Sequence, residues 1–280
     1  LNPPVMNPEN PKQPMIVHVV QNAAGPDPER NRADIDRLLA GMPRCDLVAL
    51  PEVFGLRGSD EEFRCGAEAL AGPTACWAAG IAKSRKTWVL AGSVLERSGR
   101  LVYNTSLLFD AAGRLQAHYR KLHLFEARLG TGQVVRERDV YRPGRAPVMA
   151  DCMGWRCGLS ICYDLRFPEL YRRYSARGAT LLFAPSNFTQ NTGRDHWEIL
   201  VRCRALENQC FVVAPNQCGA NVRTGVASYG NSMVVGPWGE VLARAGDEPA
   251  VLAVTLDPAQ LVETRARIPA LTHRRLWRVD

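Results

Sequence analysis

The sequence predicts an α/β protein with mixed sheets, and two features of its 280 residues point to that class. Short apolar runs such as MIVHVVQ and DLVAL are separated by segments of helical periodicity, as in parallel strands joined by crossover helices. Other apolar runs follow one another across short turns, as in LVYNTSLLFDAAGRLQAHYR, which predicts antiparallel hairpins. No segment between them has the composition of a linker, so we expect one domain over residues 15–280.

The individual elements follow from local signals. Asp27 can cap a helix over residues 27–41, in which apolar residues recur at helical spacing before Gly41 ends it. Pro51 interrupts the second strand, and Ala112-Gly113 supplies the turn of the first hairpin. We expect strands over residues 15–24, 46–54, 87–96, 101–110, 114–123, 147–151, 155–162, 179–187, 210–217 and 250–257, and a hairpin over 232–245. We expect helices over residues 27–41, 74–83, 167–177, 195–208 and 258–267.

Three segments lack such a pattern. Residues 1–14 are rich in Pro and Asn and are predicted to form a disordered leader. Residues 125–145 are polar, aperiodic and contain glycine, and a loop of this length is uncommon unless it serves a function. The C-terminal tail holds five arginines between residues 265 and 278, and we expect it to be solvated or to lie at a subunit interface.

Composition argues against several classes of function. The net charge is +7, but arginines are scattered among acids without a basic stripe on any helix, so nucleic acid is not an expected partner. No run approaches the ~20 apolar residues of a membrane helix, so no membrane partner is expected. The nine cysteines are odd in number and show no C-x-x-C spacing, which predicts neither disulfides nor a structural metal. We therefore expect a cytoplasmic protein without metal or cofactor.

Three reactive side chains stand directly after apolar runs. Cys162 ends GLSIC, and although many cysteines are simply small buried hydrophobes, an inert thiol would not need the charged Asp164 and Arg166 that follow. Glu52 ends LVALPE, where an unpaired carboxylate is costly to desolvate. Lys121 ends AHYRK, and it is one of few lysines in a chain whose basic residues are nearly all Arg. Nucleophile, base and stabilising cation at strand ends together predict an acyl-transfer site.

The segments LPEVF, YRKLHLF and GLSICYDLRFPEL resemble the three signatures of the nitrilase superfamily of carbon–nitrogen hydrolases. Further similarity extends over nearly all of residues 15–275. The resemblance implies a four-layer α-β-β-α sandwich with two mixed β-sheets, assembled as a homodimer or a larger homo-oligomer. It also implies Glu52 as base, Lys121 as stabiliser, Cys162 as nucleophile, and Glu137 as a fourth catalytic acid. The other interpretation of Glu137 is a solvated loop charge, because two arginines flank it.

The chemistry of this triad can be argued from acidity. A free thiol has a pKa of ~8.5, so Cys162 needs a base, and Glu52 within hydrogen-bond reach would take its proton as attack begins. The resulting oxyanion would be stabilised by the Lys121 ammonium and by the backbone N–H of Tyr163. Glu52 would then protonate the departing ammonia, and water activated by the same carboxylate would hydrolyse the thioester.

Within the superfamily the chain most resembles the branch of omega-amidases and amidases of deaminated glutathione, which implies a small amide substrate that carries a carboxylate. An arginine suits the bidentate geometry of a carboxylate, and Arg166 and Arg194 are the candidates. We expect Asn187, Phe188 and Thr189, which follow the apolar run ATLLFAPS, to line the substrate pocket.

Other functions stay open at this point. An N-carbamoyl amino acid amidohydrolase or a nitrilase would use the same fold and triad. A non-enzymatic binding scaffold is a further alternative, which the intact Glu52, Lys121 and Cys162 disfavour. A papain-like pair of cysteine and His196 is also disfavoured, because the local signature around a papain cysteine is absent; we expect His196 to be structural.

Overall fold

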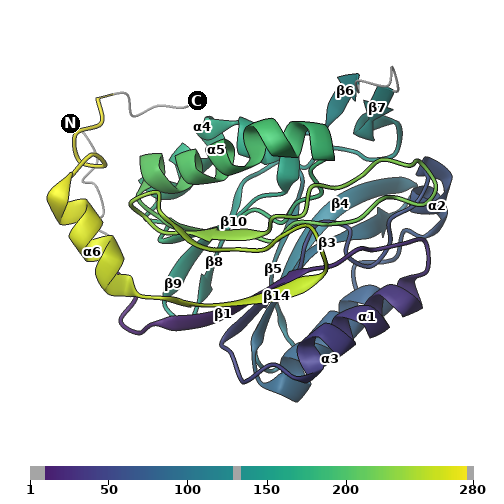
Figure 1. Ribbon diagram of the computed structural model, residues 1–280, viewed down its shortest axis with the longest axis horizontal. Helices are drawn as coiled ribbons and strands as arrows, with labels where there is room; N and C mark the ends of the chain where they lie inside the picture. The colour runs from purple at the N-terminus through teal and green to yellow at the C-terminus, as the bar shows by residue number, and fades with distance from the viewer. Residues whose placement is uncertain (1–9, 129–133, 276–280) are drawn as a thin grey trace.

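The computed structural model describes residues 10–128 and 134–275, and most of its strands belong to two large mixed sheets (Figure 1). The first sheet contains β1 (Met15–Gln21), β2 (Leu47–Ala49), β3 (Trp88–Ser98), β4 (Leu101–Phe109), β5 (Leu115–Arg120) and β14 (Ala250–Leu256). Its order is β14-β1-β2-β3-β4-β5, in which β1, β2 and β3 are parallel and the other neighbours are antiparallel. Strand β14, the last of the described strands, therefore forms one edge of this sheet and pairs with β1, the first of them.

The second sheet repeats this plan. It contains β8 (Val148–Cys152), β9 (Trp155–Leu159), β10 (Leu181–Phe183), β11 (Phe211–Ala214), β12 (Met233–Val235) and β13 (Val241–Arg244). The order is β13-β12-β11-β10-β9-β8, with β9, β10 and β11 parallel and antiparallel strands on both sides of them. The expectation that parallel and antiparallel pairing both occur is confirmed for the described residues.

Helices cover the outer faces of the two sheets. The described helices are α1 (Pro28–Ala40), α2 (Asp60–Cys65), α3 (Pro73–Arg85), α4 (Pro168–Ala176), α5 (Gln190–Asn208) and α6 (Pro258–Arg267). In Figure 1, α1 and α3 lie below the sheets and α4 and α5 lie above them. Ile35 of α1 packs in one cluster with Val48 of β2, whereas Trp197 of α5 belongs to another with Leu182 of β10. The predicted four-layer α-β-β-α sandwich is confirmed.

Alternation along the strands builds the core between the sheets. Met15, Val17 and Val19 of β1 belong to the same buried cluster as Leu159 and Phe183 of the second sheet. Val20 belongs instead to the cluster beneath α1 and α3, because successive side chains of a strand point to opposite faces. A strand buried on both faces explains why these runs are continuously apolar.

Helix α1 forms as its sequence predicts. Asp27 accepts hydrogen bonds from the N–H groups of Glu29 and Arg30, and Gly41 follows the last turn. Helix α5 differs: it begins at Gln190, five residues before its expected start, because the Thr189 side chain caps it. The Asp, Asn and Gly residues there resemble a loop, but the cap and the packing of the helix decide the boundary.

The segment expected as an irregular loop also contains regular structure. Strands β6 (Glu126–Arg128) and β7 (Val134–Arg136) pair antiparallel, and a 3₁₀ turn follows over Glu137–Asp139. This corrects the expectation for residues 125–145. Helix α2 was not expected from the sequence, and it is nucleated by a capping box between Ser59 and Glu62.

The ends of the described chain contact the domain. Residues 1–9 of the predicted leader lie outside the described residues, but Asn10 accepts a hydrogen bond from Arg265 at 2.8 Å and the Gln13 carbonyl accepts one from Trp155 at 3.3 Å.

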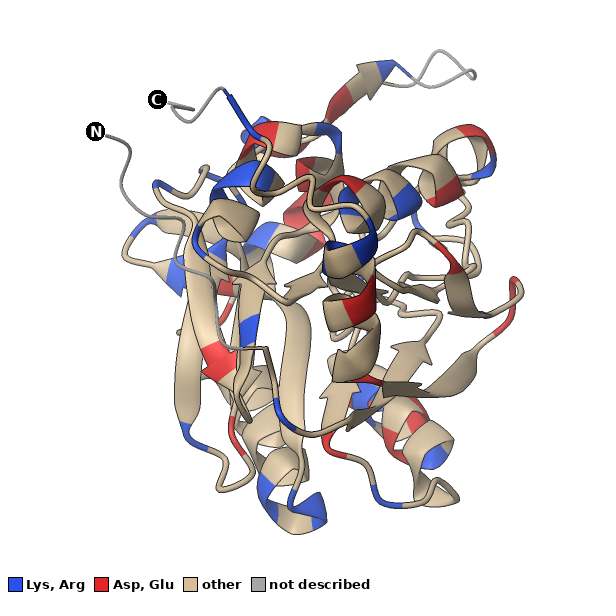
Figure 2. Ribbon diagram, turned by 90° about the vertical axis from the view of Figure 1, so that its left-hand side faces the viewer, with Lys and Arg blue, Asp and Glu red and all other residues tan. Residues whose placement is uncertain are grey.

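Figure 2 shows basic and acidic residues interspersed over the helices and loops of one side. None of the helices within residues 10–128 and 134–275 combines the length and apolarity needed to cross a bilayer.

Gly92 in β3 allows the close backbone approach that places the chain after β2. A Cβ atom at this position would lie 1.9 Å from the Leu50 carbonyl oxygen and 2.2 Å from that of Pro51. Gly92→Ala should therefore lower the free energy of unfolding by about 1–3 kcal/mol, the usual penalty of overpacking. Urea denaturation would measure it, with Gly80→Ala as control because a Cβ at Gly80 meets nothing within 4 Å. Equal stability of the two variants would contradict this account.

Candidate active site

One cavity of about 580 Å³ collects loops that follow strands of both sheets. Glu52 reaches it from the loop after β2, Cys162 from the turn after β9, and Asn187 from the segment after β10. Glu137 reaches it from the 3₁₀ turn after β7. The carboxyl ends of parallel strands thus open onto one space, as α/β proteins commonly arrange their ligand sites.

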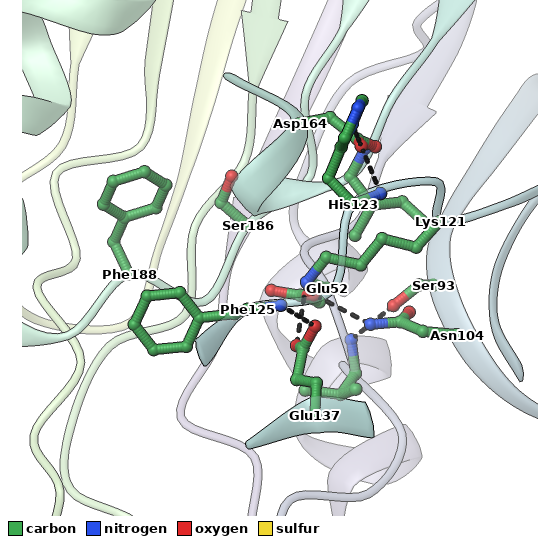
Figure 3. Close-up of polar contacts among 12 residues, drawn as sticks. Glu52, Ser93, Asn104, Lys121, His123, Phe125, Glu137, Asp164, Ser186 and Phe188 are labelled. Carbon is green, nitrogen blue, oxygen red and sulfur yellow. Dashed lines mark hydrogen bonds and ion pairs between the residues drawn. The ribbon is translucent and has the colours of Figure 1, made fainter. Parts of the chain in front are cut away.

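Lys121 is buried between two carboxylates (Figure 3). Its ammonium lies 2.9 Å from Glu52 Oε1 and 2.8 Å from Glu137 Oε1, and its side chain is 1% exposed. Lys121 follows β5 directly, and its backbone N–H donates to the Asn104 carbonyl on the neighbouring β4. The strand pairing therefore fixes where this cation enters the site.

Asn104 orients the Glu52 carboxylate. Its side-chain amide donates to Glu52 Oε1 at 2.8 Å, so this oxygen accepts from both Asn104 and Lys121. Among the described residues no donor reaches Glu52 Oε2, which leaves that oxygen available to accept a proton. Asn104 was not predicted as a site residue, although a polar residue inside the apolar run LVYNTSLLF was a usable signal.

The charges of the cluster depend on one another. Burial opposes the charged form of Lys121, but the Glu137 and Glu52 carboxylates outweigh it and raise the pKa of Lys121 well above its usual value. Burial and the nearby Glu52 charge raise the pKa of Glu137, although Lys121 acts in the opposite direction. Lys121 therefore stays an ammonium ion, and it is the group that allows two acids to occupy the same buried space.

Cys162 stands at a strained turn. Its φ is +49°, in the left-handed region that residues with a side chain rarely adopt, and a 3₁₀ helix begins with it. The Cys162 N–H donates to the Pro185 carbonyl, while Asp164 accepts from the Ile161 N–H at 2.8 Å and from the Tyr119 hydroxyl at 2.7 Å. The buried Asp164 holds the turn that presents the thiol to the cavity.

The surroundings of the Cys162 thiol favour its protonated form. Burial and the charge of Glu52 raise its pKa well above the usual value, against the effects of Lys121 and the backbone N–H of Asn187. Alkylation of Cys162 by iodoacetamide should therefore keep accelerating as the pH rises above neutrality, because the thiolate is the reactive form. Rates followed by peptide mass spectrometry would test this; a rate already constant above pH 6 would contradict it.

The residues expected to bind substrate separate into two groups. Asn187, Phe188, Thr189 and Arg166 line the cavity. Arg194 is not among the lining residues, because it lies on the solvent side of α5, where it is 73% exposed and pairs with its neighbour in sequence. The structure does not bring Arg194 to the cavity.

Two further features limit the chemistry of the site. His196 is exposed and contacts Arg166 at 3.2 Å, and it does not line the cavity that Cys162 opens onto. No three or more His, Cys, Asp or Glu side chains within residues 10–128 and 134–275 are arranged to hold a metal ion. The described groups at the cavity can exchange protons and attack as a nucleophile.

Comparisons with known proteins agree with this geometry. The family model of carbon–nitrogen hydrolases matches residues 16–266. A deaminated glutathione amidase of Synechocystis sp. (strain PCC 6803 / GT-S) is 36% identical over 270 residues, 94% of this chain and 98% of that protein. Omega-amidase NIT2 of Homo sapiens is 37% identical over 229 residues, 82% of this chain and 83% of that protein.

A solved structure is similar as well. The crystal structure of XC1258 from Xanthomonas campestris, a CN-hydrolase superfamily protein, superposes with a TM-score of 0.85 at 30% identity, covering 96% of this chain and 100% of that chain. The resemblance inferred from the three sequence signatures is confirmed. This chain belongs to the carbon–nitrogen hydrolase family and is an enzyme for carbon–nitrogen bonds other than peptide bonds.

Proposed function

We propose that this protein is an amidase that converts a small carboxylate-bearing amide to the carboxylate and ammonia through a thioester on Cys162. One observation carries the proposal: a buried ammonium, Lys121, is held between Glu52 and Glu137 at the cavity onto which Cys162 opens. Nucleophile, base and cation are the groups that acyl transfer requires.

In the first half-reaction, Glu52 Oε2 takes the thiol proton as Cys162 Sγ attacks the amide carbon. The raised pKa of the thiol makes this transfer necessary, because little thiolate exists beforehand. The Lys121 ammonium and the backbone N–H of Tyr163 stabilise the oxyanion, and one such donor is worth roughly 10²–10³ in rate. The C–N bond then breaks, Glu52 returns the proton to nitrogen, and ammonia leaves.

In the second half-reaction, Glu52 removes a proton from water, which attacks the thioester carbon. The C–S bond breaks, Cys162 regains its proton, and the carboxylate product departs. Glu137 acts throughout by holding Lys121, since its Oε1 accepts from the ammonium at 2.8 Å and its Oε2 accepts from the Phe125 N–H at 2.8 Å. This anchoring supports a catalytic position for Glu137 over a solvated loop charge.

Relatives named for deaminated glutathione and for omega-amides support a substrate with a carboxylate. Arg166 supports it too, because this cation lines the cavity beside Phe188. Hydrolysis should be measured for monoamides of 2-oxo dicarboxylates, deaminated glutathione, N-carbamoyl amino acids and simple nitriles, by ammonia release for all but deaminated glutathione, whose amide nitrogen leaves as the amine of cysteinylglycine. Turnover of the first two over the others is the expected result. Hydrolysis only of a carbamoyl compound or a nitrile would replace the proposal, and hydrolysis of none would refute it.

We also propose a cytoplasmic homo-oligomer, a dimer or larger, with the C-terminal tail at the subunit contact. The nine cysteines are all free thiols, which suits a reducing compartment. Arg274 of the tail donates to the Arg172 carbonyl and the Ser175 hydroxyl of α4, and the neighbouring α5 exposes Ile199 and Leu206. Light scattering of the purified protein should give the mass of at least a dimer, and a monomer at micromolar concentration would contradict this.

A further inference from the structure

Arg57 is a buried cation that lacks a carboxylate partner among the described residues. Its side chain is 1% exposed, and Nη1 donates to the Cys218 carbonyl at 3.0 Å and to the Ser228 hydroxyl at 2.7 Å. Nε and Nη2 have no acceptor within the part of the chain that the structure describes. Burial lowers the pKa of Arg57 only to about 10, so the guanidinium is charged at neutral pH.

This arrangement differs from that of other buried cations in the protein. Lys121 contacts two carboxylates, and Arg204, which is also buried, pairs with Glu207 at 2.6 Å. A buried charge without a counter-charge is strongly unfavourable, and so are donors without acceptors. The surroundings of Arg57 are therefore incomplete as they stand, and an anion would complete them.

Arg57 lines the cavity together with neutral polar residues that contact one another or the loop that carries Arg57. The Ser228 hydroxyl donates to Asn187 Oδ1 at 2.5 Å, Thr189 bridges Ser228 in a strand-like pair, and Asn221 Nδ2 donates to the Gly58 carbonyl at 2.9 Å. We call Arg57, Asn187, Thr189, Asn221 and Ser228 the Arg57 cluster; all five line the cavity. The cluster combines one positive charge with several hydrogen-bonding groups and contains no acid.

We propose that the Arg57 cluster is a carboxylate subsite of the cavity, in which Arg57 supplies the counter-charge for the anionic end of the substrate. The inference rests on the proposed amidase function and names the residue that determines its specificity. Arg57 follows Glu52 by five residues on the same loop, so the base and the anchoring charge are joined by one short connection. A carboxylate held there would fix the distance, along the substrate, between this group and the amide carbon that Cys162 attacks.

Arg166 is the competing candidate for this role. It is partly exposed, contacts His196, and lies 5.9 Å from the ring centres of Tyr163 and Phe188. Its charge is accordingly more screened by solvent than that of Arg57, which water hardly reaches. The Arg57 charge should therefore contribute more to discrimination between an anionic and a neutral substrate.

The test compares succinamate with its uncharged methyl ester as amide substrates of the full-length enzyme. Arg57→Gln should lower kcat/KM for succinamate roughly 10–100-fold, mainly through KM, and change that for the ester less than threefold. Arg100→Gln, at an exposed hairpin turn, is the matched control and should change neither. An equal loss on both substrates would assign Arg57 a purely structural role, and no loss on either would overturn the subsite directly. Discrimination abolished by Arg166→Gln but intact in Arg57→Gln would overturn it as well.

Two measurements separate this inference from the amidase proposal. Calorimetric titration with succinate needs no turnover: wild type should bind it more tightly than Arg57→Gln, whereas equal affinity, or no binding to wild type, would overturn the subsite even if the enzyme hydrolyses amides. Should Arg57→Gln fail to fold, Arg57→Lys keeps the charge without the fork. It should lose part of the succinamate activity while still preferring succinamate to the ester, and loss of that preference with the charge retained would count against the subsite.

Discussion

Replacing Cys162 by alanine should abolish amide hydrolysis, with kcat lowered roughly 10⁴–10⁶-fold. A loss of this size is usual when the nucleophile is removed from a set of catalytic residues that act as a unit. The substrate should still bind, because the residues that line the cavity remain. Steady-state ammonia release and a binding titration would measure the two effects separately.

The matched control is Cys203→Ala. Cys203 is an exposed thiol on α5 and is not among the cavity residues, so this variant should keep wild-type activity. The same rate in Cys162→Ala and wild type would exclude covalent catalysis by this residue. A loss of activity in Cys203→Ala equal to that in Cys162→Ala would show that the assay reports stability rather than chemistry.

Replacing Lys121 by methionine should be the most destabilising change at the site. Removal of the ammonium leaves Glu52 and Glu137 buried beside each other without their shared partner. We expect the free energy of unfolding to fall by about 3–5 kcal/mol, the usual effect of breaking a buried ion pair. Urea denaturation followed by circular dichroism would measure it.

The destabilisation should depend on pH with a definite sign. The pKa of Glu137 is already raised by burial and by Glu52, and loss of the cation raises it further. The folded variant then binds protons more readily than the unfolded chain, so its stability should recover as the pH falls from that raised pKa toward the ordinary value of about 4.3. Lys83→Met, at an exposed position of α3, should show neither effect. Loss of stability in Lys121→Met that grows on acidification would contradict the assigned cluster.

The sequence predicts the parts of this molecule that depend on local chemistry. The helix between Asp27 and Gly41 forms as expected because its cap and its apolar spacing lie within fifteen or so residues of each other. Glu52 and Lys121 were assigned together from their signatures, and in the structure their side chains are 2.9 Å apart. A charged residue at the end of an apolar strand is informative because its burial requires a partner.

The sequence does not predict features that depend on distant contacts. Arg57 looks like a solvated loop residue, and its burial comes from Cys218 and Ser228, 161 and 171 positions further along the chain. Arg194 looks like a pocket residue when α5 is expected to begin after it. Since the helix begins earlier and buries Gly193 and Trp197, Arg194 is turned toward solvent.

The most direct test of the account is acid quenching of the enzyme during turnover of a carboxylate-bearing amide, followed by mass spectrometry. The account predicts a chain heavier by the acyl group, with the added mass on the peptide that contains Cys162 and lost again when the thioester is hydrolysed. Acylation of another residue, or ammonia release with no acylated chain at any quench time, would contradict it.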